Sequence, residues 1–213
     1  LKVDFPLPKH FVGQASLGGD ARVQLRIAVS EPGGAKRRVT RSVAVVRQPV
    51  RVVALPESGR LEARIPQRVY LLTTLPDGAP TRAQVRVTLR NGDQSVLRVQ
   101  TDAQGIGVLQ ITPKAGSSVG LSMAVRDHQG REAVVRQTLS VRWSGEPLLV
   151  RPAKALWRVG ETLSLDVLAS KRDGYAYVDL LRGQQILSTH QVALRQGRGR
   201  LQVKLGRESR GVV

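Results

Sequence analysis

The sequence contains no cysteine. Disulfide bonds, thiolate metal ligands and cysteine nucleophiles are therefore excluded. Aromatic residues make up only 3% of the chain, which leaves few rings on which a binder of single-stranded nucleic acid could stack bases. No run approaches 18 uncharged apolar residues, so no segment reads as a membrane-spanning helix. Hydrophobic residues still make up 41% of the chain, which is enough for a folded core.

Motifs for catalysis, metal binding and cofactor binding are also missing. The three histidines, His10, His128 and His190, lie far apart in the sequence, so we expect no multi-histidine zinc site. There is no Gly-x-Ser-x-Gly elbow for a hydrolase nucleophile. "TDAQG" at 101–105 has one carboxylate where a calcium loop needs several oxygens. "QGRGR" at 196–200 precedes a predicted strand rather than the helix of a phosphate cradle. We therefore expect no enzyme, no metal and no cofactor.

The chain carries 34 basic and 16 acidic residues, for a net charge of +18. Residues 1–47, 48–143 and 144–213 each carry +6, and most arginines occupy the polar positions of alternating strands. Such an even spread is typical of solvated faces rather than a nucleic-acid groove. The densest cluster is Lys36, Arg37, Arg38 and Arg41. It is a candidate contact for an anionic glycan, a lipid headgroup or an acidic domain, and the alternative is a charged strand edge that discourages aggregation.

Apolar residues alternate with polar ones along much of the chain, as in Ala83, Val85, Val87 and Leu89. This pattern predicts half-buried strands of antiparallel sheets. Between residues 48 and 144 we expect seven strands, near 50–55, 66–75, 83–90, 95–100, 106–111, 119–126 and 132–142. The segment at 76–80, Pro-Asp-Gly-Ala-Pro, is interpreted as the corner that joins the second of these strands to the third. We expect almost no helix.

Two hairpin phrases, one from Val23 and one from Val119, read alike and lie 96 residues apart. The prolines that follow them, Pro49 and Pro147, lie 98 residues apart, so the two offsets predict a structural period close to 97 residues. That period is the size of one antiparallel β-sandwich. The expected fold is therefore all-β, with tandem immunoglobulin- or fibronectin-like sandwiches at 1–47, 48–144 and 145–213. About three strands are expected in the first segment. Five are expected in the last, near 148–151, 162–169, 175–181, 185–194 and 199–205.

The two tryptophans, Trp143 and Trp157, flank the second predicted boundary. We expect them to pack between domains or to plug the ends of sandwiches. By the same period, the first sandwich lacks its beginning and the third lacks its end. Because an unfinished sandwich exposes a sheet edge, we expect the sequence to be a fragment of something longer.

The order of phrases resembles the macroglobulin domains of the alpha-2-macroglobulin and complement family. The resemblance lies in "PVRVVALPESGRLEARIPQRVYLLTTLPDGAPTRAQVRVTL", in "TDAQGIGVLQITP" and in the closing hairpin. "KALWRVGETLSLDVLASKRDGYAYVDLLRGQQILSTHQVAL" is similar to the start of the next such domain. The resemblance implies the C-terminal part of one macroglobulin-like sandwich at 1–47, a complete one at 48–144 and the N-terminal part of a third at 145–213.

The resemblance also implies a function. Family members of this kind, bacterial ones included, are secreted or lie in the cell envelope or periplasm, and many trap proteases through a bait segment and a thioester. The thioester requires cysteine and so cannot lie in this chain. The chain would be a non-catalytic scaffold segment of a protease-trapping or complement-like protein. Its partners would be neighbouring macroglobulin domains and, through the full-length parent, proteases; a membrane would be involved only if the parent is anchored.

The alternative interpretation is a tandem immunoglobulin-like module of a cell-envelope adhesin or of a protein that binds anionic polymers. In that case the basic faces would contact acidic surface polymers, with Lys36, Arg37, Arg38 and Arg41 as the candidate residues.

Overall fold

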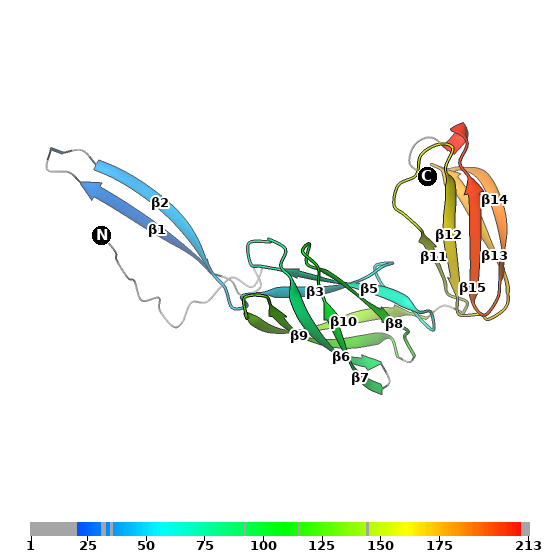
Figure 1. The fold of residues 1–213 in the computed structure, drawn as a ribbon, viewed down its shortest axis with the longest axis horizontal. Coiled ribbons are helices and arrows are strands. Elements are labelled where there is room, and N and C mark those ends of the chain that lie inside the picture. Colours follow the sequence, from blue (N-terminus) through cyan, green and yellow to red (C-terminus); the bar gives the residue numbers. More distant parts are fainter. Residues whose placement is uncertain are drawn as a thin grey trace.

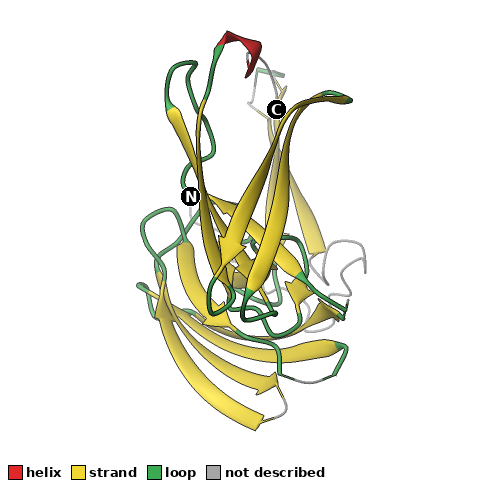
Figure 2. Cartoon of the chain, turned by 90° about the vertical axis from the view of Figure 1, so that its right-hand side faces the viewer, coloured by secondary structure: helices red, strands yellow, loops and turns green. Residues whose placement is uncertain are grey.

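A computed structural model describes residues 21–30, 33–34, 36–91, 93–114, 116–143 and 145–209. Apart from one 3-10 turn, Arg207–Ser209, the regular elements in these residues are all strands (Figures 1 and 2). Their bounds are β1 Ala21–Ser30, β2 Lys36–Val45, β3 Arg51–Pro56, β4 Leu61–Glu62, β5 Gln67–Thr74, β6 Ala83–Asn91, β7 Asp93–Gln100, β8 Ile106–Ile111, β9 Ser118–Asp127, β10 Glu132–Arg142, β11 Leu148–Pro152, β12 Thr162–Ala169, β13 Gly174–Arg182, β14 Gln185–Leu194 and β15 Arg198–Lys204. The described helical turn is far too short to cross a membrane.

The all-β prediction is confirmed. Each of the seven strands predicted between residues 48 and 144 is present, as are the five predicted after it. The two-residue strand β4 was not predicted, because so short a segment has no alternation to detect. Of about three strands expected before residue 48, two are described, and residues 1–20 lie outside the described part. The domain boundaries at 47/48 and 144/145 remain a proposal.

Strands β3 to β10 form a sandwich of two sheets. One sheet has the order β4-β10-β9-β6-β7 and the other the order β3-β5-β8. All pairings are antiparallel except the short parallel contact between β10 and β4. The inward side chains of both sheets form one buried cluster, in which Val69, Val87 and Met123 are fully buried. Burial on this scale, at roughly 1.5–3 kcal/mol for each large apolar side chain, stabilises the unit.

The corner at 76–80 joins β5 to β6, the second and third of the predicted strands, as the sequence predicted. Because β5 and β6 belong to different sheets, it also carries the chain from one sheet of the sandwich to the other. Gly78 has a φ of 89°, a left-handed conformation that favours glycine. The Asp77 carboxylate accepts a hydrogen bond of 3.0 Å from the Ala79 amide. Pro80 then forms an isolated antiparallel bridge with Thr74.

Strands β11 to β15 form a second, smaller sandwich. The sheet β11-β12-β15 faces the hairpin β13-β14 across a second apolar cluster. This cluster is less completely enclosed. Leu163, Leu165 and Leu201 keep 8–9% of their surface exposed, whereas Val69 and Leu71 of the larger sandwich keep 0%.

Strands β1 and β2 form an isolated antiparallel hairpin at the far end of the molecule (Figure 1). Ile27, Val29, Val39 and Val43 are 46–57% exposed. Within the described residues, no strand pairs with the outer edge of either member of this hairpin.

Candidate functional site

The most developed polar contact in the described part of the chain joins the two sandwiches. Glu57 follows β3, and Arg151 lies on β11. The guanidinium of Arg151 donates two hydrogen bonds to the carboxylate, with Nε 2.8 Å from Oε2 and Nη2 2.6 Å from Oε1. Their side chains are only 11% and 18% exposed. Paired geometry of this kind fixes direction as well as distance.

The electrostatics of this pair favour the charged forms. Burial raises the pKa of Glu57, but hydrogen bonds from the Arg151 side chain and the Arg68 amide outweigh it, so the pKa lies below its ordinary value. The hydrogen bond to Glu57 raises the pKa of Arg151 in turn, against the opposing effect of burial. The pair therefore stays ionised at neutral pH.

An apolar contact lies beside the ion pair. Ile65, just before β5, forms a small buried cluster with Leu149 of β11 and Leu168 of β12. Ile65 is 0% exposed and the two leucines are 7% exposed. These residues point away from the cores of their own sandwiches, so their burial comes from contact between the two units.

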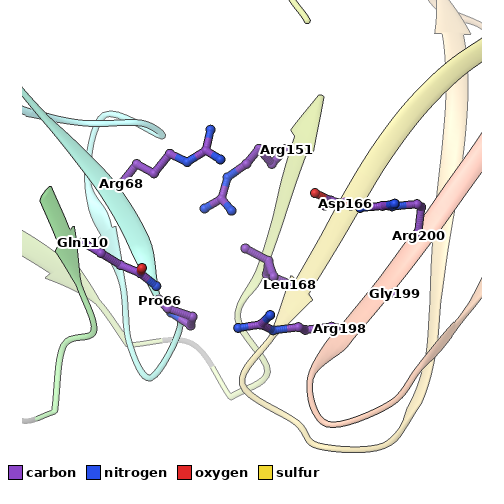
Figure 3. Close-up of a pocket in the computed structure, with 9 residues that line it drawn as sticks. All are labelled: Pro66, Arg68, Gln110, Arg151, Asp166, Leu168, Arg198, Gly199 and Arg200. Carbon is purple, nitrogen blue, oxygen red and sulfur yellow. The ribbon is translucent and has the colours of Figure 1, made fainter. Parts of the chain in front are cut away.

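A cleft of about 520 Å³ opens next to this contact. Residues from both sandwiches line it: Pro66, Arg68, Gln110, Arg151, Asp166, Leu168, Arg198, Gly199 and Arg200. Figure 3 shows Arg68 reaching in from β5 and Arg198 from β15. Arg151 is paired with Glu57, and Arg200 Nε lies 2.9 Å from Asp166 Oδ1.

Among the described residues, the guanidinium groups of Arg68 and Arg198 form no direct salt bridge, although Arg68 attracts the Glu57 carboxylate from a longer distance. The cleft therefore has an excess of positive charge on two opposing walls. Such a site can hold an anion, since guanidinium groups are suited to carboxylate, sulfate and phosphate oxygens.

The sequence-predicted cationic cluster lies on β2. Lys36, Arg37, Arg38 and Arg41 are all exposed. Because side chains alternate along a strand, Lys36 and Arg38 share one face of the hairpin, and Arg37 and Arg41 share the other. The structure thus divides the four cations into two pairs.

The two tryptophans contact residues of their own units. Trp143 donates a hydrogen bond from Nε1 to the Gly116 carbonyl, and the Arg64 guanidinium lies 5.3 Å from the centre of its ring. Trp157 packs against the core of the smaller sandwich, with Lys154 Nζ 4.4 Å from its ring centre. Packing of these rings between domains remains a prediction.

Sequence reasoning missed Glu57 and Arg151, which are 94 residues apart. No local pattern links them. The apolar run Leu148-Leu149-Val150 beside Arg151 gives no signal either, because only Leu149 is buried, whereas Leu148 and Val150 are 45% and 46% exposed. Of the histidines, His128 and His190 lie in the described part and His10 lies outside it. Among the described residues, no three His, Asp or Glu side chains are grouped to hold a metal ion.

Comparisons with known proteins give structural likenesses only. No family model matches the chain, and no curated protein matches it. The chain is similar to trypsin-activated alpha-2-macroglobulin from Escherichia coli, at a TM-score of 0.36 and 13% identity over 87% of this chain and 17% of that one. It is also similar to the native conformation of E. coli alpha-2-macroglobulin, at 0.37 and 11% over 89% and 19%.

A tetra-tandem repeat from the extending region of a large adhesion protein is similar at a TM-score of 0.35 and 11% identity, over 89% of this chain and 50% of that one. The chain thus spans less than a fifth of the two macroglobulins and half of the adhesin structure. It is an all-β chain of sandwich units that resembles segments of bacterial alpha-2-macroglobulins and of an adhesin repeat.

Proposed function

We propose that this chain is a non-catalytic scaffold segment of an alpha-2-macroglobulin-like, protease-trapping protein of the secreted or cell-envelope compartment. Successive sandwiches built from one repeating strand order support this role, as do the sequence phrases that resemble macroglobulin domains. The observation that carries the proposal is the junction between the sandwiches. A flexible string of domains would not need a buried, two-point ion pair there.

A scaffold of this kind has to transmit movement between its domains. A scaffold must hold its domains at fixed angles so that displacement at one end reaches the other. The pair Glu57–Arg151 and the cluster of Ile65, Leu149 and Leu168 restrain the junction both electrostatically and by packing. Domains of one chain move relative to one another by default, so a rigid scaffold needs contacts of this kind to restrain them.

The test is a trapping assay on the full-length natural protein that contains these residues. A trap leaves a bound protease active on a small peptide substrate and blocks its action on a large protein. With the full-length protein, we expect the protease to cleave the small peptide but not the large protein. With the 213-residue chain alone, we expect the protease to cleave both substrates. Equal protease activity on both substrates in the presence of the full-length protein would refute the proposal.

A second candidate function is a module that binds anionic polymers of the cell envelope. The cleft with Arg68 and Arg198 on opposite walls favours it. On a heparin-like column, replacing both arginines by serine should lower the eluting salt concentration more than replacing Arg60 and Arg90, two exposed arginines outside the cleft, by serine. Each double variant removes two positive charges. If both lower the eluting salt concentration by the same amount, retention on the column depends on net charge alone and not on the cleft.

The exposed cations of β2 are the alternative contact for an anionic polymer. Replacing Lys36, Arg37, Arg38 and Arg41 by serine tests whether the hairpin, rather than the cleft, contacts the polymer. A larger shift than that of the cleft variant, charge for charge, would place the contact on β2.

A further inference from the structure

The outer face of the sheet β3-β5-β8, on the side away from the core of the larger sandwich, is apolar. Its side chains form two cross-strand rows of three: Val53, Leu72 and Ile106 in one row, and Leu55, Tyr70 and Val108 in the other. The four that lie on β3 and β8 are 39–50% exposed. Single apolar side chains on a surface are normal, but a contiguous patch of them marks a contact surface. We call this patch the apolar face.

The smaller sandwich has a sheet of the same strand order, β11-β12-β15, and two glycines align the two sheets. A Cβ atom on Gly107 would lie 2.6 Å from a valine methyl group of the facing hairpin, and so would a Cβ atom on Gly199. Gly107 pairs with Leu71, and Gly199 pairs with Val167. Val167 therefore corresponds to Leu71, which lies 96 positions earlier in the chain.

This alignment places the apolar face at the position that forms the junction in the smaller sandwich. Leu168 corresponds to Leu72. Its cross-strand neighbour Leu149 corresponds to Val53, the neighbour of Leu72. Leu149 and Leu168 pack on Ile65 of the larger sandwich and are only 7% exposed. The position that is covered at Leu149 is 45% exposed at Val53.

The chain arrives at the two faces from two matching hairpins. Val43 of β2 and Leu139 of β10 hold equivalent positions, each opposite a valine of the strand before it. They lie 96 positions apart, as do Val53 and Leu149, so no net residue is gained or lost between hairpin and face. The hairpin β9-β10 is the last part of the larger sandwich, which the smaller one contacts. By the same spacing, the hairpin β1-β2 would be the last part of a sandwich that contacts the apolar face.

We propose that, in the full-length natural protein, the apolar face binds the sandwich to which β1-β2 belongs, in the way that the smaller sandwich binds the larger one. The inference rests on the proposed scaffold function, in which residues 1–47 are the C-terminal part of that preceding sandwich. The occupant is this sandwich because the equivalent face of the smaller unit contacts the unit directly before it in the chain.

The chemistry of the apolar face determines the chemistry of its partner. The junction within the chain has charged groups where the apolar face has none, since Arg151 stands at the position of Leu55 and Arg198 at the position of Ile106. A carboxylate placed like that of Glu57 would therefore be buried against the apolar face without a counter-charge, which is costly. The preceding sandwich must instead present apolar side chains, and the contact has no arginine-lined cleft.

Thiol labelling measures whether the apolar face is covered. Val53→Cys introduces a thiol into a segment that has none, and mass spectrometry follows the labelling of that peptide in the full-length natural protein and in the 213-residue chain. We expect labelling to be at least about tenfold slower in the full-length protein, because a thiol buried in an interface is unreactive. Equal rates in the two proteins would overturn the inference.

The matched control is Val134→Cys, on the outer face of the opposite sheet. Val134 is 58% exposed, so its thiol should react at the same rate in both proteins. Because Val53 and Val134 are both exposed in the 213-residue chain, neither substitution should impair folding. Labelling of Val53→Cys that slows as the concentration of the 213-residue chain rises would mean that a second copy covers the face, which would also contradict the inference.

A photochemical cross-link identifies the occupant. With p-benzoylphenylalanine in place of Val108, which is 50% exposed, the full-length protein should give a cross-link to a peptide of the sandwich that contains β1-β2. A cross-link to any other part of the protein, or to another molecule, would refute the proposed contact.

These outcomes are distinguishable from those of the trapping assay. A full-length protein that protects Val53→Cys but does not trap a protease would keep the contact and lose the proposed function. One that traps a protease while Val53→Cys stays accessible would keep the function and lose the contact.

Discussion

At the scale of single residues, glycines at equivalent positions shape the two sandwiches. Gly105 and Gly197 have φ angles of 72° and 73°, and a Cβ atom on either would lie within 2.6 Å of a carbonyl oxygen of the facing strand. Gly107 and Gly199 lie two residues further on, where their strands touch the opposite sheet. The sequence phrases "GIG" and "GRG" are thus the same structural element, which their flanking residues conceal.

These close contacts lead to a stability prediction. Ala at position 107 meets a valine methyl group that can shift, whereas Ala at 199 also meets the Ala193 carbonyl oxygen at 2.8 Å. Overpacking costs about 1–3 kcal/mol, so we expect Gly199→Ala to be the more damaging change. Urea unfolding followed by tryptophan fluorescence measures both changes, Gly199→Ala in a Trp143→Phe background that isolates the signal of the smaller sandwich and Gly107→Ala in a Trp157→Phe background that isolates that of the larger one.

The control is Gly145→Ala, where a Cβ atom meets nothing within 4 Å. It should leave the unfolding midpoint unchanged. A smaller loss for Gly199→Ala than for Gly145→Ala would show that the packing described at β15 is wrong.

The ion pair at the junction makes the relative motion of the sandwiches dependent on pH. The folded-state pKa of Glu57 lies below its ordinary value of 4.5, so its contribution is fully present above about that pH and is lost as the pH falls through the lowered pKa. We expect the sandwiches to tumble together at pH 7 and more independently once the pH falls below the lowered pKa of Glu57. Rotational correlation times from 15N relaxation measure this.

The variant Glu57→Gln should produce the loosened state already at pH 7. Removing one partner leaves the other buried without its counter-charge, at a cost of about 2 kcal/mol to the contact. Glu132→Gln is the control, because Glu132 pairs with Arg126 inside one sandwich and both side chains are 67% exposed. If Glu57→Gln left the correlation times at pH 7 unchanged, the ion pair would have no part in restraining the junction.

At the scale of elements, the strands could be predicted because apolar and polar residues alternate along most of them, as in β6 and β9. Strand β4 could not, since its two residues pair in parallel with β10, far away in the sequence. The contact between β10 and β3 could not be predicted from the sequence either. There the Gln137 amide mimics a neighbouring strand, accepting a hydrogen bond of 2.9 Å from the Ala54 amide and donating one of 2.7 Å to its carbonyl.

This side-chain amide leads to a prediction about the edge of β3. Gln137→Leu keeps the size of the side chain but leaves the N–H and C=O of Ala54 without these partners at a fully buried position. We expect a loss of about 2 kcal/mol in the free energy of unfolding of the larger sandwich. Urea unfolding of a Trp157→Phe background, which isolates the signal of that sandwich, measures it.

Gln84→Leu is the comparison, because Gln84 is exposed on β6. It should change the free energy of unfolding by less than about 0.5 kcal/mol. Equal losses for the two variants would mean that the hydrogen bonds of Gln137 contribute nothing specific.

At the scale of the whole molecule, the sequence predicts the repeat but not the junction. Two hairpins with apolar residues at matching positions imply repeated sandwiches, because each hairpin must bury its apolar face against a similar core. The junction depends instead on side chains that point away from the cores, such as Glu57, Ile65 and Arg151, and alternation says nothing about what covers an outer face. The cleft lined by arginines could not be predicted either, because in the sequence Arg68 and Arg198 occupy ordinary polar positions of alternating strands.

The central claim is that two sandwiches are held at one fixed arrangement by the contact between Glu57 and Arg151 and its apolar neighbours. Spin labels on Ser95→Cys of the larger sandwich and Gln184→Cys of the smaller one report this directly, since the chain has no other cysteine. Double electron–electron resonance at pH 7 should give a single narrow distance distribution. A broad distribution spanning many separations would contradict the account.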